Sequence, residues 1–307
     1  MKWIPTALVL VAATLLPLVG GDFYVNLASQ ILVAVLMAAS LNLLVGYAGL
    51  TSLGQAAFLG VAAYTCAWTG VKLGVSPVVA AGLACLMTLA VSALFGAIAL
   101  RASGLGFLMI TLAMSQVVWG LAYRLVAISN GDNGISGIVR PSPLGLSLES
   151  PGAFYWFTLL VVVLALWFIA ILVRSSFGAT LAGTRDQPQR MAALGHNVWL
   201  IRFAAFMISG FLAGIAGLLF VWYNKYIHPS ALSMTASAEA LLAVIAGGSG
   251  TLAGPVVGAA VVVLLKNYAS AYVERWNMML GFVFLLIVLF LPEGIVPGVK
   301  RLLGRGR

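Results

Sequence analysis

The side chains that could bind a small polar solute are concentrated in one short stretch of an otherwise apolar chain. Residues 41–60 read LNLLVGYAGLTSLGQAAFLG, where four glycines accompany amide and hydroxyl groups, among them Asn42, Ser52 and Gln55. Amides and hydroxyls donate and accept hydrogen bonds, so they suit the reversible binding of a polar group. Glycine adds main chain that can turn sharply. The stretch therefore predicts a polar lining beside the path of a solute.

A second glycine cluster, at residues 244–260, has a similar pattern. It reads VIAGGSGTLAGPVVGAA and lies about 200 residues after the first. Corresponding glycine-interrupted segments in two halves of a chain point to the central pathway of a transporter. The physical reason is that non-helical backbone survives in a bilayer only inside protein or beside a watery cavity. The alternative for Gly250, Gly254 and Gly258 is a small-residue stripe that only packs helices together.

One carboxylate, Glu239, joins these clusters as a candidate because it begins an apolar run. A carboxylate deep in a bilayer costs at least about 2.5–3.5 kcal/mol on insertion scales, so such residues usually serve a function. At the membrane interface the cost would be small. The candidate substrate-pathway residues are Asn42, Gly46, Gly49, Ser52, Gly54, Gln55, Glu239, Gly247, Gly250 and Gly254.

Motifs that would indicate an enzyme are missing from the sequence. It contains no Gly-x-x-x-x-Gly-Lys phosphate loop, no His-Glu-x-x-His motif and no Gly-x-Ser-x-Gly nucleophile elbow. Cys66 and Cys85 fall in apolar runs and match no metal-ligand spacing. His196 and His228 fall in loops, where we expect them to be solvated. We therefore expect no catalytic residue, metal site or cofactor in this chain, and any ATP that drives it is hydrolysed by a separate subunit.

The elements that must position the candidate residues are membrane-spanning helices. Of the 307 residues, 63% are hydrophobic and only 7% are charged, whereas a soluble domain carries about 25% charged residues. The apolar runs are continuous rather than alternating, which excludes a β-barrel. We therefore expect an all-α fold, a polytopic integral membrane helical bundle that forms a single domain over residues 1–307.

About 20 apolar residues are needed for each helical span, which gives about ten transmembrane segments. They are 4–20, 24–45, 51–70, 76–100, 105–125, 154–173, 203–223, 237–250, 254–273 and 278–292. The segments 237–250 and 254–273 are short or split by glycine, so they are either plain spans or re-entrant segments. The first segment has the basic start of a signal peptide but no clear cleavage site, and we favour a retained span.

The distribution of charge predicts the orientation. The chain has 16 Lys and Arg against 7 Asp and Glu, an excess that could indicate nucleic acid binding. The basic residues instead cluster at the C-terminus and around one polar loop, as they do in the cytoplasmic parts of membrane proteins. Both termini are then cytoplasmic, and the loop 126–153 is periplasmic, where it either lines an outer vestibule or forms an exposed turn region. The outer side holds Lys72, Arg124, Arg140, Lys225, Lys266 and Arg275.

The polar loop between the sixth and seventh segments is patterned rather than a simple linker. In residues 183–197, Pro188 suits the first turn of a short helix over 188–194, with Asp186 and Gln187 as candidate caps. Gly195 is placed to end that helix. The helix would present Met191 and Leu194 on one face, so it either docks a partner protein or rests on lipid head groups.

Four stretches of the sequence resemble one protein family. Residues 41–65, 129–138 (SNGDNGISGI), 183–219 and 238–260 are similar to branched-chain amino acid ABC transporter permeases of the LivM type. The resemblance implies a bacterial inner-membrane subunit that imports branched-chain amino acids. Its partners would be a LivH-like second permease, two cytoplasmic ABC ATPase subunits and a periplasmic amino-acid-binding protein. Related permeases carry urea, short amides and other small solutes. An ion-coupled secondary transporter remains a third possibility, and it would need ionisable groups at mid-membrane, where only Glu239 is a candidate.

The resemblance also assigns a role to the loop 183–197. It implies that this loop carries the coupling helix, which seats in a groove of the ATPase. The candidate coupling residues are Arg185, Asp186, Arg190, Ala192, Ala193 and Gly195. Two positions depart from the family pattern: acidic residues common before the Ala-Ala pair are replaced here by Gln189 and Arg190, and a frequent histidine is replaced by Gln55. We expect closure of the ATPases to push the helix and rock the bundle between outward-open and inward-open states.

Overall fold

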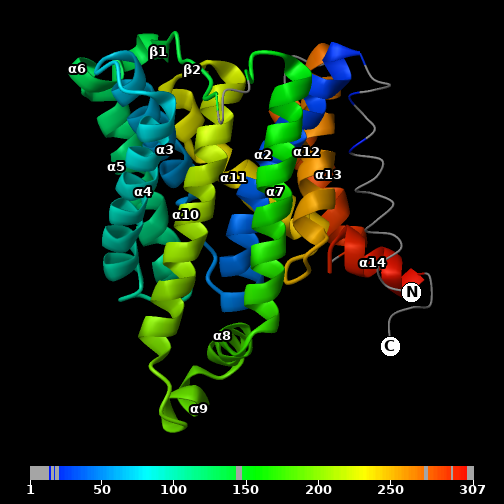
Figure 1. Cartoon of the computed structure of the whole chain (residues 1–307). Coiled ribbons are helices and arrows are strands. Elements are labelled where there is room, and N and C mark those ends of the chain that lie inside the picture. The colour runs from blue at the N-terminus through cyan, green and yellow to red at the C-terminus, as the bar shows by residue number, and fades with distance from the viewer. Residues whose placement is uncertain are drawn as a thin grey trace.

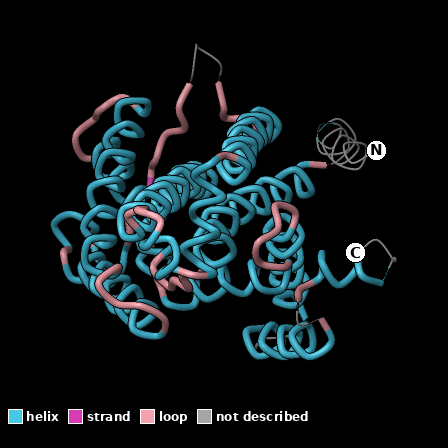
Figure 2. Tube along the Cα trace, turned by 90° about the horizontal axis from the view of Figure 1, so that it is seen from below, coloured by secondary structure: helices cyan, strands magenta, loops and turns pink. Residues whose placement is uncertain are grey.

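The computed structural model describes residues 14, 17, 21–142, 147–272, 276–291 and 293–302. Its helices run roughly parallel in one bundle, which Figure 1 shows from the side and Figure 2 nearly end-on. The predicted all-α membrane bundle is confirmed, because five described helices are long and apolar enough to cross a bilayer. They are α2 with its π-helical extension η1 (Asp22–Asn42 and Leu43–Ala48), α4 (Pro77–Ala99), α5 (Leu105–Arg124), α7 (Pro151–Arg174) and α10 (Val198–Asn224).

Four shorter helices fill the remaining predicted segments. They are α3 (Gln55–Val71), α11 (Met234–Gly247), α12 (Gly254–Tyr272) and α13 (Trp276–Phe290), and α14 (Ile295–Leu302) follows them. Each predicted segment from 24–45 to 278–292 thus coincides with a described helix, whereas 4–20 lies almost entirely outside the described residues. The 14 residues of α11 reach only about 21 Å at 1.5 Å per residue, less than the ~30 Å of a hydrocarbon core. Segment 237–250 is therefore too short for a complete span.

The centre of the bundle is formed by α2, α3 and α10. In the apolar stretches of α2–η1 and α10, 72% and 67% of the residues are buried, against 17% in α5. Small residues allow these helices to approach closely: a Cβ atom on Gly217 of α10 would lie 2.9 Å from the carbonyl carbon of Leu59 in α3. Below that contact, the ring of Phe206 meets Phe58 and Phe107 with centroids 5.6 and 6.1 Å apart. This core fixes the helices that carry the first glycine cluster.

Capping residues set the start of several helices. Ser150 accepts a hydrogen bond from the Ala153 amide at the start of α7, Asn197 from Leu200 at the start of α10, and Ser233 from Ala236 at the start of α11. Such caps replace the intrahelical partners that the first amide groups of a helix lack. Proline occupies the first turn of both α4 and α7, where its missing amide costs nothing.

The polar loop forms two helices that lie below the bundle in Figure 1, α8 (Ser176–Asp186) and α9 (Pro188–Ala193). The predicted helix over 188–194 is confirmed as α9. Gly195 follows it with a φ of +86°, as expected of a glycine that ends a helix. Helix α8 was not predicted. The expected side-chain cap was wrong, because Asp186 is the last residue of α8 and Gln187 occupies the N-cap position without a capping hydrogen bond from its side chain.

The opposite end of the bundle is closed by short elements that bring two loops together. They are α6 (Val126–Ser129), η2 (Gly131–Asn133), β1 (Ile135–Ser136), β2 (Tyr226–Ile227) and η4 (Pro229–Leu232). The antiparallel pairing of β1 with β2 places the loop 126–153 against the connection between α10 and α11. The expectation that His228 is merely solvated was wrong, because its Nε2 lies 3.3 Å from Oδ1 of Asp132. The pairing of distant loops created this contact.

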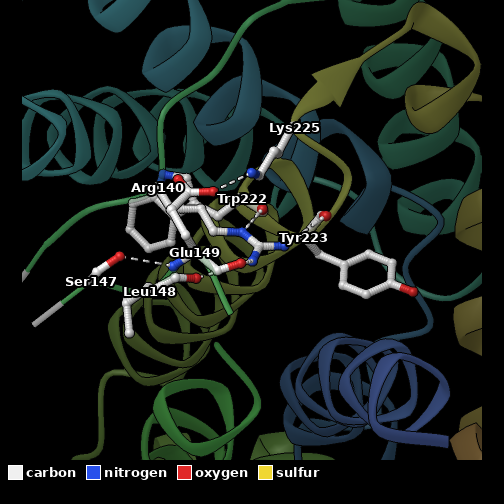
Figure 3. Close-up of polar contacts among 7 residues, drawn as sticks. All are labelled: Arg140, Ser147, Leu148, Glu149, Trp222, Tyr223 and Lys225. Carbon is white, nitrogen blue, oxygen red and sulfur yellow. Dashed lines mark hydrogen bonds and ion pairs between the residues drawn. The ribbon is translucent and has the colours of Figure 1, made fainter. Parts of the chain in front are cut away.

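Arg140 anchors the loop 126–153 to the end of α10 (Figure 3). Its guanidinium donates to the carbonyl oxygens of Trp222 and Tyr223 at the helix end and of Leu148 and Glu149 in the loop. It also lies 4.4 Å from the ring centroid of Phe154. Burial lowers the pKa of Arg140, and the nearby Glu149 opposes that shift. A hydrogen bond from Lys225 in turn lowers the pKa of Glu149.

We expect the Arg140→Ala variant to be less stable than the wild type by about 2 kcal/mol. Hydrogen bonds to charged groups contribute about 1.5–3 kcal/mol each, but in the variant water can bond some of the carbonyl groups that Arg140 leaves. Thermal unfolding in detergent, followed by intrinsic fluorescence, measures the loss. Arg124→Ala is the control, since Arg124 is an exposed arginine at the end of α5. Equal unfolding temperatures for the two variants would contradict the anchoring role.

Candidate functional site

The first glycine cluster interrupts the chain between α2 and α3. Helix α2 continues as η1 to Ala48, Gly49 follows with a φ of +69°, and the chain is non-helical until α3 begins at Gln55. Ser52 and Gln55 are fully buried, so the unwound segment lies inside protein. The predicted break in the helical main chain is confirmed here, and Gly54 occupies its last position.

Hydroxyl groups from two neighbouring helices and from the break itself satisfy the main chain at this break. Thr111 of α5 accepts from the Leu53 amide at 3.3 Å, Ser52 from the Gly54 amide at 3.1 Å, and Ser237 of α11 from the Ala56 amide at 3.1 Å. Unsatisfied amides in hydrocarbon cost several kcal/mol each. These hydroxyls therefore allow α3 to begin inside the bundle rather than at the membrane surface.

Gln55 joins three helices through its side-chain amide. Its Nε2 donates to Oγ of Ser209 in α10 at 2.7 Å and to Oγ of Ser40 in α2 at 3.3 Å. Ser209 in turn donates to the carbonyl oxygen of Ser40 at 2.7 Å. The Oε1 atom of Gln55 is buried and has no hydrogen-bond partner among the described residues. The amide thus holds the start of α3 in place and keeps one acceptor available.

The second glycine cluster interrupts the chain between α11 and α12. The residues 248–253 are non-helical, and Gly248 and Gly250 have φ values of +111° and +78°. Thr251 closes the turn by donating to the carbonyl oxygen of Gly248 at 2.9 Å and accepting from the Gly254 amide at 3.0 Å. Gly247 lies against Gly254 across the turn. The predicted second break is therefore also confirmed.

The two breaks meet inside the bundle although they are about 200 residues apart in sequence. Asn42 at the end of α2 donates from Nδ2 to the Thr251 carbonyl oxygen at 3.0 Å and accepts on Oδ1 from the Gly250 amide at 2.9 Å. The main chains at Gly46 and Gly250 are in direct contact. A Cβ atom on Gly46 would lie 2.7 Å from Cα of Gly250 and closer still to its amide nitrogen. Only glycine fits this contact.

Two arginine side chains connect α8 to the first break and to α10. Arg185, near the end of α8, donates to the carbonyl oxygen of Gly46, and its side chain lies against Gly49. Arg202 of α10 donates to the carbonyl oxygen of Thr184 in α8 at 2.6 Å. Asp186 lies 3.8 Å from Arg185 and is exposed. A displacement of α8 would therefore reach the first break through one side chain.

Helix α9 presents a bare surface at the tip of this arrangement. None of its described residues is buried, and Arg190, Ala192 and Ala193 are exposed. Met191 points back onto Gly183 of α8, whereas the side chain of Leu194 is 68% exposed. The prediction of one apolar face thus holds for Leu194 alone, because Met191 is used to hold α9 against α8.

Glu239 takes part in a polar contact at some distance from the two breaks. Both of its carboxylate oxygens accept from Nζ of Lys266, at 3.2 and 3.1 Å. Lys266 lies within α12, in the second half of that helix.

One hollow in the described part of the chain lies away from the breaks. It has a volume of about 460 Å³ and is lined by apolar residues of α4, α7 and α10, among them Leu89, Phe168, Met207 and Phe211. None of the candidate residues lines it. Asn42, Ser52 and Gln55 are instead buried against the protein itself, so this conformation keeps the breaks closed.

The sequence did not reveal several residues that complete the site. In the sequence, each of them is an isolated hydroxyl or cationic side chain within or beside an apolar run. Such a residue does not indicate which group it contacts. The residues are Ser40, Thr111, Arg202, Ser209, Ser237, Thr251 and Lys266.

Comparison with known proteins identifies relatives along nearly the whole chain. The family described as branched-chain amino acid transport system / permease component matches residues 23–289. The high-affinity branched-chain amino acid transport system permease proteins LivM of Salmonella typhimurium and Escherichia coli are each 28% identical to the chain over 94% of its length and 73% of theirs. The autoinducer 2 import system permease protein LsrC of Salmonella typhi is 31% identical over 56% of the chain and 49% of its own length. No solved structure gives a significant match.

The contact between the breaks predicts a strong effect of one methyl group. We expect Gly46→Ala to lower the free energy of unfolding by about 1–3 kcal/mol, because the added Cβ meets main chain that cannot move aside. Gly70→Ala in α3 is the control, since a Cβ there has no neighbour within 4 Å. Thermal unfolding of the purified variants measures the difference. Indistinguishable stabilities would mean that the two breaks are not in contact.

Proposed function

The chain belongs to the family of permease components of branched-chain amino acid transport systems, and on that premise we propose that it translocates branched-chain (hydrophobic) amino acids across the bacterial inner membrane. It does so as one subunit of an ATP-binding cassette importer. Its partners are a LivH-like second permease, two cytoplasmic ABC ATPase subunits and a periplasmic amino-acid-binding protein. ATP is bound and hydrolysed by the ATPases, and this chain contributes the membrane path.

The observation that carries this proposal is the meeting of two unwound segments inside a membrane bundle. Asn42 links them through two hydrogen bonds to the main chain of Gly250 and Thr251. Non-helical main chain at membrane depth is characteristic of transport pathways. When the breaks separate, the same amide and main-chain groups become available to a passing solute, and the buried Oε1 of Gln55 is an acceptor already in place. Tight binding is left to the periplasmic protein.

The α8–α9 pair supports ATP-driven coupling. Helix α9 projects away from the bundle (Figure 1) and exposes Leu194, which suits docking to a protein groove better than lying flat on a membrane. Arg185 connects the pair to Gly46, so a push on α9 is transmitted to the first break. In this proposal α8, α9 and both termini are cytoplasmic, and the loop 126–153 is periplasmic.

The choice of solute rests on how much of the chain each relative matches. The LivM proteins, named for high-affinity branched-chain amino acid transport, match 94% of the chain, whereas LsrC, named for autoinducer 2 import, matches 56%. The apolar surroundings of the breaks also suit a solute with an aliphatic side chain. Urea, short amides and other small solutes are the alternatives within the same mechanism.

Reconstitution of the complete complex in liposomes tests the proposal. We expect uptake of leucine, isoleucine or valine that requires ATP, the binding protein and this subunit together. A variant of the ATPase that binds but does not hydrolyse ATP is the matched control and should give no uptake. Uptake that persists without ATP and follows an ion gradient would instead identify a secondary transporter.

A substitution at Gly195 tests the role of α9. A β-branched residue is strained at the φ of +86° found there, by roughly 1–2 kcal/mol, so we expect Gly195→Val to displace α9 and uncouple ATP hydrolysis from uptake. Membrane insertion should be unaffected, because no atom lies within 4 Å of the added Cβ. Gly195→Asn is the control, since asparagine tolerates positive φ. Normal uptake by Gly195→Val would remove α9 from the coupling mechanism.

A further inference from the structure

A band of polar side chains crosses three helices on one side of the bundle, away from the two breaks. Glu239 of α11 accepts two hydrogen bonds from Lys266 of α12, at 3.2 and 3.1 Å. Next to Lys266, Asn267 donates to Oε1 of Gln30 in α2 at 3.1 Å. Figure 1 shows α2, α11 and α12 as neighbours. We call these four residues the polar band.

The polar band lies within the membrane. Lys266 precedes the end of α12 at Tyr272 by six residues, which places it about 9 Å inside that end at 1.5 Å per residue. Gln30 follows the start of α2 at Asp22 by eight residues, or about 12 Å. Both ends lie at the side of the bundle opposite α8 and α9 (Figure 1). The band therefore occupies the outer half of the membrane in the proposed orientation.

The ion pair in the band is not sealed inside the bundle. The side chain of Lys266 is 39% exposed and that of Glu239 is 24% exposed. A charged pair that faces acyl chains loses hydration without full compensation. The exposed surfaces of α4, α5 and α7 are by contrast built from residues such as Leu86, Met109 and Leu160. The face that carries Glu239 and Lys266 is thus suited to contact with water or polar groups.

We propose that Glu239 and Lys266 form a station for the zwitterionic head of the solute on its way through the membrane. The inference rests on the proposed amino-acid import and adds a site to it. The ammonium group of the solute replaces Lys266 at the Glu239 carboxylate, while the solute carboxylate binds the Lys266 ammonium. Every charge remains paired during this exchange, which avoids the large cost of an isolated charge in a low-dielectric region. Because the pair is neutral overall, a neutral zwitterion matches it and a solute with net charge does not.

Exposure to water is tested first, with thiol chemistry in the assembled complex. In a Cys66→Ala/Cys85→Ala background, Glu239→Cys and Lys266→Cys should react with a membrane-impermeant cationic thiosulfonate, and leucine supplied with its binding protein and ATP should slow the reaction. Leu86→Cys is the control, because Leu86 is 65% exposed on an apolar face and should not react. If Glu239→Cys and Lys266→Cys are as unreactive as Leu86→Cys while the background variant still imports leucine, the station does not exist.

The second test measures transport after both members of the ion pair are replaced by neutral side chains. We expect Glu239→Gln/Lys266→Gln to lower the maximal rate of leucine uptake by about tenfold or more, with normal assembly and ATP hydrolysis, and the swapped pair Glu239→Lys/Lys266→Glu to restore part of it. Glu293→Gln/Arg301→Gln removes an exposed ion pair near α14 and should have no effect. A purely structural pair would tolerate neutral replacement, so wild-type uptake by Glu239→Gln/Lys266→Gln overturns the inference. Failure of the wild-type complex to import any amino acid would instead refute the proposed function.

Discussion

The structure depends on one constraint: main chain that leaves the helical conformation inside a membrane must find its hydrogen bonds within the protein. Two segments of this chain do so. At the first break, the hydroxyl groups of Ser52, Thr111 and Ser237 accept hydrogen bonds from main-chain amides just before and at the start of α3. At the second break, Thr251 closes the turn, and the side chain of Asn42 forms hydrogen bonds with one main-chain amide and one main-chain carbonyl. Because several of these partners come from other helices, each break is stable only in the assembled bundle.

The same requirement joins local structure to long-range motion. A break whose hydrogen bonds come from neighbouring helices changes its partners whenever those helices shift, whereas an intact helix moves without breaking its own bonds. Arg185 makes this connection for α8, since it donates to the carbonyl oxygen of Gly46 within the first break. The contact of Gly46 with Gly250 extends it to α12. A short path of side-chain and main-chain contacts therefore links α9 to both breaks.

Sequence patterns predicted the elements better than the contacts between them. Continuous apolar runs gave the helices, and Gly195 and Pro188 bounded α9 because their backbone preferences act locally. Helix α8 was missed because its polar composition has no apolar stripe to indicate a helix, and its order comes from Arg202 and from packing under α10. The partnership of Glu239 with Lys266 was missed for a related reason: the two residues are 27 positions apart on different helices, and no periodicity connects them. Glycine clusters showed where the main chain unwinds, but the hydroxyls that stabilise it are single residues in apolar runs.

The contacts are distributed unequally along the bundle, and this has a consequence for the proposed transport cycle. At the end opposite α8, Arg140 bonds four carbonyl groups from two segments, the strands β1 and β2 pair, and Lys225 bonds Glu149. At the other end, Leu181 is fully buried and the arginines Arg185 and Arg202 bond the carbonyls of Gly46 and Thr184, so α8 is held to the bundle, whereas α9 has no buried residue. Rigidity at one end and the unburied surface of α9 at the other favour movement that begins at α9 and passes to α8. In the proposed importer, such movement reaches the breaks before it reaches the loops at the opposite end, so the part of the proposed path next to α8 is the part that the partner ATPases would open or close directly.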